Sequence, residues 1–136
     1  MEKNRIQKLE QILKDYFAAY GCLTNSPEET VQRMKLNHTS PQNRKEMLIC
    51  KALQIIAELD PSIEALSITE TEMLAELYDS TETVRHQAET LAKNKGVTLR
   101  TVYRMRLDLL EKIDKTLSIV LSDSDRQRCF ETRWGS

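Results

Sequence analysis

The chain has 136 residues, and its 20 basic and 21 acidic side chains give a formal net charge of -1 at pH 7. This length allows one well-buried core and excludes two domains of ordinary size. The sequence contains only 3 Gly and 3 Pro, and it lacks the runs of β-branched and aromatic residues that strands need. We therefore predict an all-α fold with long helices.

Apolar residues recur at helical spacing near the start of the chain. They are separated by three or four positions, which is typical of an amphipathic helix. These residues are Ile6, Leu9, Leu13, Tyr16 and Tyr20. Gly21 follows them and is a suitable C-cap, so we expect the helix to end there. The apolar face has two interpretations: it packs against the rest of the same chain, or it forms a seam with a second subunit.

A second helix is predicted from the stretch Ser26-Pro27-Glu28-Glu29. Serine is a good N-cap, proline suits the first helical position, and a glutamate three residues after the cap completes a capping box. We expect this helix to run to about Lys35, so that residues 1–35 form an N-terminal helical segment. Residues 36–43, LNHTSPQN, show no period and contain turn formers, and we interpret them as a linker.

Helical periodicity resumes at Arg44, and we assign residues 44–121 to one unit. Its first apolar stripe consists of Leu48, Ala52, Ile55, Ile56 and Leu59. Asp60-Pro61 is expected to end this helix, because proline disfavours helical backbone at the residue before it.

A capping box formed by Thr69 and Glu72 predicts the start of the next helix. Its apolar residues are Met73, Leu74, Leu77 and Tyr78, and it is expected to close at Asp79-Ser80-Thr81. From Ser122 onward the period is lost, so we expect residues 122–136 to form a flexible tail.

The near-neutral total hides two segments of opposite charge. Residues 60–82 contain seven acidic side chains and no Lys or Arg, whereas residues 84–106 contain six basic side chains and one acid, Glu89. Local excess of positive charge is typical of contact with a polyanion, since each Lys or Arg that neutralises a phosphate releases condensed counterions. A solvated helix face is the alternative explanation, and residue spacing has to decide between the two.

The stretch LAKNKGVTLRTVYRMR, residues 91–106, has the spacing of a helix-turn-helix. Two helices that cross steeply need a small residue where they meet, a residue that tolerates positive φ at the turn, and an apolar residue to pin the turn. Ala92, Gly96 and Val97 meet these demands in order. Thr98 is a good N-cap for the second helix, and Val102 is expected on its inward face.

The outward residues at the start of the second helix are the predicted base-contacting set. They are Thr98, Leu99, Arg100, Thr101, Tyr103 and Arg104. Arginine can fork onto guanine O6 and N7, threonine can bond a base or phosphate, and leucine can touch a thymine methyl. Lys93, Lys95 and Arg106 flank the insertion and are predicted to bind phosphates. We therefore predict that the chain binds double-stranded DNA.

The sequence ITETEMLAELYD followed by VRHQAETLAKNKGVTLRTVYRMRLDLLEKI resembles the region-4-type helix-turn-helix of sigma factors. More narrowly, residues 44–121 are similar to small phage and prophage regulators of the ArpU and RinA type. This resemblance implies an all-helical N-terminal segment, a linker and a C-terminal helix-turn-helix, and a function as an activator of late phage genes. It also makes RNA polymerase a possible protein partner.

No other pattern indicates chemistry. His38 and His86 are isolated, and no nucleophile, metal or glycine-rich phosphate motif is present, so we expect no enzyme activity, cofactor, metal site or small-molecule substrate. Cys22, Cys50 and Cys129 are far apart, which favours free thiols in a reducing cytoplasm. No leader-like or membrane-spanning stretch is seen. The alternative function is a helical adaptor or antagonist of a transcription factor that docks through residues 60–82.

The last predicted helix continues past Arg106 and carries two apolar stripes. The first consists of Leu107, Leu110, Leu117 and Leu121, with Asp114 interrupting it, and the second of Leu109, Ile113 and Val120. One stripe can cover the core of the same chain, which leaves apolar surface on the other. A homodimer would bury that surface and supply two DNA half-sites, and we favour it. In the alternative, residues 1–35 fold back and cover the second stripe within a monomer.

Overall fold

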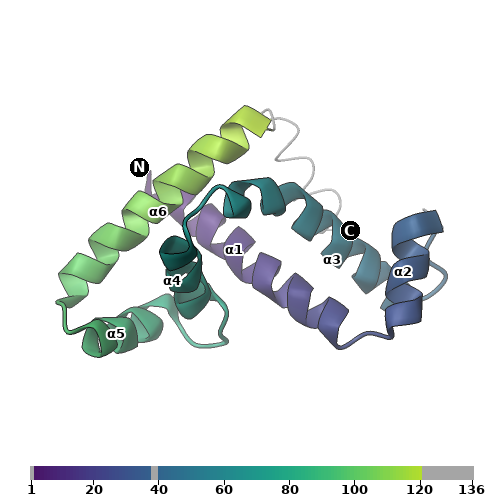
Figure 1. The fold of residues 1–136 in the computed structure, drawn as a ribbon, viewed down its shortest axis with the longest axis horizontal. Helices are drawn as coiled ribbons and strands as arrows, with labels where there is room; N and C mark the ends of the chain where they lie inside the picture. The colour runs from purple at the N-terminus through teal and green to yellow at the C-terminus, as the bar shows by residue number, and fades with distance from the viewer. Residues whose placement is uncertain (1, 38–39, 121–136) are drawn as a thin grey trace.

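The computed structural model describes residues 2–37 and 40–120, which form six α-helices (Figure 1). The helices are α1 (Lys3–Thr24), α2 (Glu28–Asn37), α3 (Arg44–Glu64), α4 (Ile68–Tyr78), α5 (Val84–Lys95) and α6 (Leu99–Val120). No strand occurs within these residues, so the predicted all-α fold class is confirmed. The predicted tail, residues 122–136, lies outside the described residues.

One hydrophobic core joins helices from the two ends of the described chain. α1 runs beside α3 and packs most extensively against it, and it also contacts α4 and α6 (Figure 1). Leu13 of α1, Leu74 of α4 and Leu110 of α6 are fully buried in the same apolar cluster. Of the two interpretations of the apolar face of residues 6–20, burial against the rest of the same chain is confirmed. The first part of the predicted N-terminal segment, residues 1–35, therefore shares the core of the following helices. Only α2 lies to one side, against α3.

The starts of α3 and α4 are fixed by side chains that bind backbone N–H groups. Asn43 accepts a hydrogen bond from the Glu46 backbone N–H at 2.9 Å and caps α3. Ser67 and Glu70 form a reciprocal capping box at α4, with bonds of 3.1 and 3.0 Å. The capping box predicted at Thr69 and Glu72 was therefore wrong by two residues, because Ser67-x-x-Glu70 offers the same spacing two residues earlier.

The first helix does not end at Gly21 as predicted. α1 continues to Thr24, and the Asn25 backbone N–H donates to the Gly21 carbonyl at 3.1 Å. The Ser26 hydroxyl donates to the Cys22 carbonyl at 2.7 Å, so it satisfies the end of α1, whereas the sequence predicted it as the N-cap of α2. A glycine can occupy a helix interior at a cost of about 1 kcal/mol, which the packing of α1 against α3 offsets.

The helix break predicted at Asp60-Pro61 is also wrong, since α3 continues through Pro61 to Glu64. Proline removes one backbone hydrogen bond from a helix interior, so other contacts must hold this turn. Leu59 and Ile63 are buried in the core on either side of the proline. The carboxylate of Asp60 also accepts a hydrogen bond from a tyrosine hydroxyl of α1 at 2.7 Å. Tertiary contacts thus outweigh the tendency of Pro61 to end the helix.

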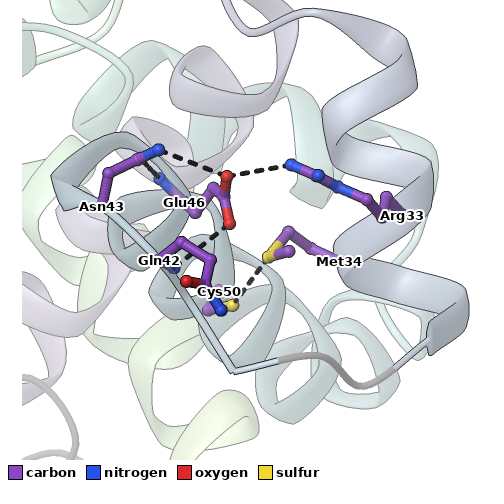
Figure 2. A network of polar contacts seen from close by, with 6 residues as sticks. All are labelled: Arg33, Met34, Gln42, Asn43, Glu46 and Cys50. Atoms are coloured by element: carbon purple, nitrogen blue, oxygen red, sulfur yellow. Dashed lines mark hydrogen bonds and ion pairs between the residues drawn. The ribbon is translucent and has the colours of Figure 1, made fainter.

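A buried carboxylate connects α2 to the start of α3 (Figure 2). Glu46 accepts hydrogen bonds from Arg33 Nη2 at 2.9 Å, from the Gln42 backbone N–H at 3.2 Å and from Asn43 Nδ2 at 3.3 Å. Burial of a charge is tolerated when it is paired and hydrogen-bonded, and the first turn of a helix also favours an anion. Glu46 therefore fixes α2 on α3 and stabilises the N-terminus of α3.

Most of the two apolar stripes of α6 is buried within one chain, although Leu107 is only half-buried. Leu109, Leu110, Ile113 and Leu117 all lie in the core, which α1 and α3 help to cover. Leu121 lies outside the described residues. Asp114, the polar interruption in the first stripe, accepts hydrogen bonds from Arg5 Nε at 2.9 and 2.8 Å. Most of the apolar surface that favoured a homodimer is thus covered by the chain itself, as expected in the alternative.

We therefore expect the protein without DNA to be monomeric. Among the side chains of α6 that the structure describes, Leu109, Leu110, Ile113 and Leu117 are buried, so no long apolar stripe is left there for a second copy to cover. Light scattering at micromolar concentration should give a mass near the 15.8 kDa of one chain. A mass near twice that value, persisting on dilution, would contradict this expectation.

Candidate nucleic-acid interface

The turn between α5 and α6 is built around one glycine. Gly96 has φ 68° and ψ 31°, the left-handed conformation that the sequence predicted for it. The Val97 backbone N–H donates to the Ala92 carbonyl at 3.0 Å, and the Gly96 N–H donates to the Lys93 carbonyl at 3.4 Å. This pair of bonds is a Schellman motif, which satisfies the last carbonyls of α5 and turns the chain sharply.

The start of α6 is capped by Thr98. Its hydroxyl oxygen accepts a hydrogen bond from the Thr101 backbone N–H at 3.2 Å, and its carbonyl accepts from the Val102 N–H at 3.2 Å. The hydroxyls of Thr98 and Thr101 also lie 2.9 Å apart. Because the cap and the glycine are only two residues apart, α6 leaves the turn in a direction different from α5 (Figure 1).

Small and apolar residues fill the place where α5 and α6 meet. Leu91 and Ala92 of α5 are buried, and so is Val102 of α6. Met105 is partly buried against the same core. Val97 was predicted to pin the turn, but its side chain is 38% exposed. The backbone bonds of the Schellman motif close the turn, which leaves the Val97 side chain directed outward.

The predicted DNA-contacting residues divide into two groups by exposure. Lys93, Lys95, Thr98, Arg100 and Arg104 are exposed. The others, Leu99, Thr101, Tyr103 and Arg106, are half-buried. Leu99 and Tyr103 pack against the core, so at most part of each side chain faces solvent. The exposed group lies on the turn and on the outer face of the first two turns of α6.

Four cations of this region have no ion-pair partner within residues 2–37 and 40–120. Among the described residues, no carboxylate lies within ion-pair distance of Lys93, Lys95, Arg100 or Arg104. In contrast, Arg85 at the start of α5 binds the Glu89 carboxylate at 3.1 Å. Unpaired cations on one surface give a positive potential that attracts anions. We call the surface formed by these four residues and Thr98 the basic surface.

Arg106 is placed differently from the sequence prediction. Its Nη1 donates to Glu10 Oε2 at 2.6 Å, and both side chains are only 16% exposed. The guanidinium also lies 5.1 Å from the ring centroid of Tyr103. Because Glu10 precedes Arg106 by 96 residues, no sequence pattern could have identified this pair. We therefore omit Arg106 from the basic surface.

Tyr78 of α4 completes this polar cluster. Its hydroxyl donates to Glu10 Oε2 at 2.8 Å. Burial raises the pKa of the Tyr78 hydroxyl, and the Glu10 carboxylate raises it further, so the hydroxyl stays protonated and remains a donor. The cluster of Glu10, Tyr78 and Arg106 thus connects α1, α4 and α6.

The described residues show few other features that could support binding or catalysis. Within residues 2–37 and 40–120, no three His, Cys, Asp or Glu side chains are grouped closely enough to hold a metal ion. Cys22 and Cys50 are free thiols, and Cys129 lies outside the described residues. No helix in the described part of the chain is long and apolar enough to cross a membrane. Comparisons of the chain with protein families, curated proteins and solved structures find no match.

Proposed function

We propose that this chain is a sequence-specific, DNA-binding transcriptional regulator. The observation that carries the proposal is the basic surface, in which unpaired cations stand on both sides of a left-handed glycine turn. A short, sharply turned pair of helices presents the start of its second helix to the major groove of DNA. Polyanion binding also explains why the chain leaves these cations unpaired beside an acid-rich segment.

Different residues of the basic surface have different proposed roles. Arg100 and Arg104 are four residues apart on α6, so they lie on one face and can reach neighbouring base pairs. Lys93 and Lys95 stand at the end of α5, where they can bind phosphates and fix the register. The Thr98 hydroxyl oxygen caps α6 by accepting from the Thr101 N–H. In the proposed complex the same hydroxyl lies near the DNA backbone.

The direction of regulation and the partners rest on the resemblance of residues 44–121 to regulators of the ArpU and RinA type. On that basis we propose that the protein activates late genes of a phage or prophage. Activation of this kind requires a productive contact with RNA polymerase. Because one helix-turn-helix makes few base contacts, we also propose that two copies occupy adjacent half-sites on the operator.

The proposal predicts salt-dependent binding to duplex DNA. It also predicts that the arginines and the lysines of the basic surface affect sequence preference differently. On an operator selected from random duplexes, Arg100→Ala or Arg104→Ala should weaken binding by about 1–3 kcal/mol and relax the sequence preference. Lys93→Ala or Lys95→Ala should weaken binding to all duplexes alike. Either should also reduce, by about 1, the magnitude of the slope of the logarithm of the binding constant against the logarithm of salt concentration. Filter binding over a series of salt concentrations measures both quantities.

Lys115→Ala is the matched control, because Lys115 is an exposed cation on α6, the helix that carries Arg100 and Arg104. It lies about 16 Å beyond Arg104 along the helix axis. It should leave both affinity and slope unchanged. If the wild-type protein shows no salt-dependent binding to any duplex, the DNA-binding proposal is wrong. The adaptor function, with docking through residues 60–82, would then be favoured.

A further inference from the structure

A groove on the side of the molecule formed by α1, α3 and α4 is not explained by DNA binding. Its volume is about 410 Å³, within the range of ligand-binding clefts. It is lined by α1 residues Tyr16, Phe17, Tyr20, Gly21 and Thr24, and by Asn25, Ile63, Thr71 and Asp79. The second half of α1, which supplies most of this lining, lies away from the turn between α5 and α6 (Figure 1).

The floor of the groove is aromatic and held in a fixed arrangement. The ring of Tyr16 packs edge-to-face on Phe17 and on Tyr20, with centroids 5.4 and 5.1 Å apart. Asp60 accepts hydrogen bonds from the hydroxyls of Tyr16 at 2.7 Å and Tyr20 at 3.0 Å. Tyr20 is nevertheless 42% exposed. A rigid, partly exposed aromatic ring is the kind of residue that contributes most to protein interfaces.

The surroundings of the floor are negatively charged. Asp79 lines the groove, and none of its lining residues in the described part of the chain is Lys or Arg. Asp60 binds the Tyr20 hydroxyl at 3.0 Å, and Glu64 follows one turn later on α3. Burial raises the pKa of the Tyr20 hydroxyl, and the negative charges of Asp60 and Glu64 raise it further. These acids belong to the acidic segment 60–82, which the proposed DNA contact does not use.

The backbone adds to this negative potential. Gly21 and Thr24 lie in the last turn of α1, Ile63 lies in the last turn of α3, and Asp79 caps the end of α4. The C-terminal end of a helix carries a partial negative charge, which proteins commonly offset with a cation in the last turn. None of these three helices has a basic residue in its last turn. Three uncompensated helix ends therefore meet at one aromatic groove.

We propose that this groove is a docking site for a basic, amphipathic helical segment of a partner protein. One apolar side chain of the segment enters between Tyr20 and Ile63, and its Lys or Arg residues lie beside Asp60, Glu64 and Asp79. DNA and anionic lipid surfaces are repelled by the same potential. The site is separate from the basic surface and does not depend on the proposed DNA binding.

The test uses the full chain and a synthetic peptide of Leu and Lys in an amphipathic pattern, about 14 residues long so that it can form a helix. A nitrogen-15 NMR titration should shift the backbone signals of Tyr20, Gly21, Thr71 and Asp79. The same pattern built from Leu and Glu should cause no shifts. A Ser and Lys peptide of equal charge should bind at least about tenfold more weakly, because it has no apolar anchor.

Three substitutions at Gly21 provide variants that should fold, because Gly21 is helical and a Cβ there meets no atom within 4 Å. Gly21→Ala controls for the change in helix propensity. Relative to Gly21→Ala, we expect Gly21→Lys to weaken the Leu/Lys peptide by about two- to fivefold and Gly21→Glu to strengthen it by a similar factor. Glu28→Gln, an exposed acid on α2, should have no effect.

Three results would overturn the proposal. One is equal affinity of the three Gly21 variants for the Leu/Lys peptide. Another is equal binding of the Ser and Lys peptide, which would mean that charge alone attracts it. The third is a set of shifts at Tyr20 and Asp79 produced by hexylammonium as strongly as by the peptide, which would make the groove a site for small organic cations.

Discussion

Replacing Arg106 with alanine is expected to lower the free energy of unfolding by about 3 kcal/mol. The substitution leaves the Glu10 carboxylate without its cation in a site where both groups are only 16% exposed. Removal of one partner from a buried ion pair costs about 3–5 kcal/mol, and we expect the lower end because the pair keeps some contact with water. Denaturant-induced unfolding followed by circular dichroism measures the change.

Lys112→Ala is the matched control for Arg106→Ala. Lys112 lies on the same helix and binds Glu70 Oε2 at 2.6 Å, but its side chain is 61% exposed. Exposed ion pairs are worth about 1 kcal/mol or less, so this variant should lose little stability. Equal losses in the two variants would show that the Arg106 pair does not connect α1 to α6 in the way the structure indicates.

Gly96→Val is expected to lower the free energy of unfolding by about 1–3 kcal/mol, and to weaken DNA binding at temperatures where the folded form still dominates. A Cβ on Gly96 would meet no atom within 4 Å, so the cost does not come from a clash. It comes from φ 68°, which a β-branched residue rarely adopts. The loss of stability can be measured by the same unfolding experiment.

Gly96→Asn tests whether the loss of stability comes from the left-handed conformation or from the addition of any side chain at this position. Asparagine enters the left-handed region more readily than other non-glycine residues, so this variant should lose less than Gly96→Val. Val97→Ala, at the next and exposed position, should change stability little. If the Val and Asn variants at Gly96 are equally stable, the turn does not depend on the left-handed conformation.

Several signals that depend only on neighbouring residues predicted the structure correctly. The cap at Thr98, the positive φ of Gly96 and the burial of Val102 follow from the chemistry of residues 96–102 alone. The all-α class, which the scarcity of Gly and Pro and the lack of β-branched and aromatic runs predicted, is also confirmed. Local rules failed where two signals competed, as at Ser67 and Thr69, or where packing overrode them, as at Pro61.

The parts that could not be predicted are contacts between distant residues. Asp114 looked like a defect in an apolar stripe, and its partner Arg5 precedes it by 109 residues. Arg106 looked like a phosphate contact because its neighbours are basic, but Glu10 and Tyr103 engage it. The groove could not be predicted either, because its lining comes from three helices and nothing in the sequence indicates that their ends meet.

The contacts between α1 and α6 also have a consequence for the order of events during synthesis. Arg5 and Glu10 leave the ribosome early, but their partners Asp114 and Arg106 follow 109 and 96 residues later. At about 5–20 residues per second, the first helix waits roughly 5–20 s before its partner helix exists. During that interval the apolar stripe of α1 has only α3 and α4 to cover it. Completion of the core is therefore a late step, and contacts of such long sequence separation slow it further.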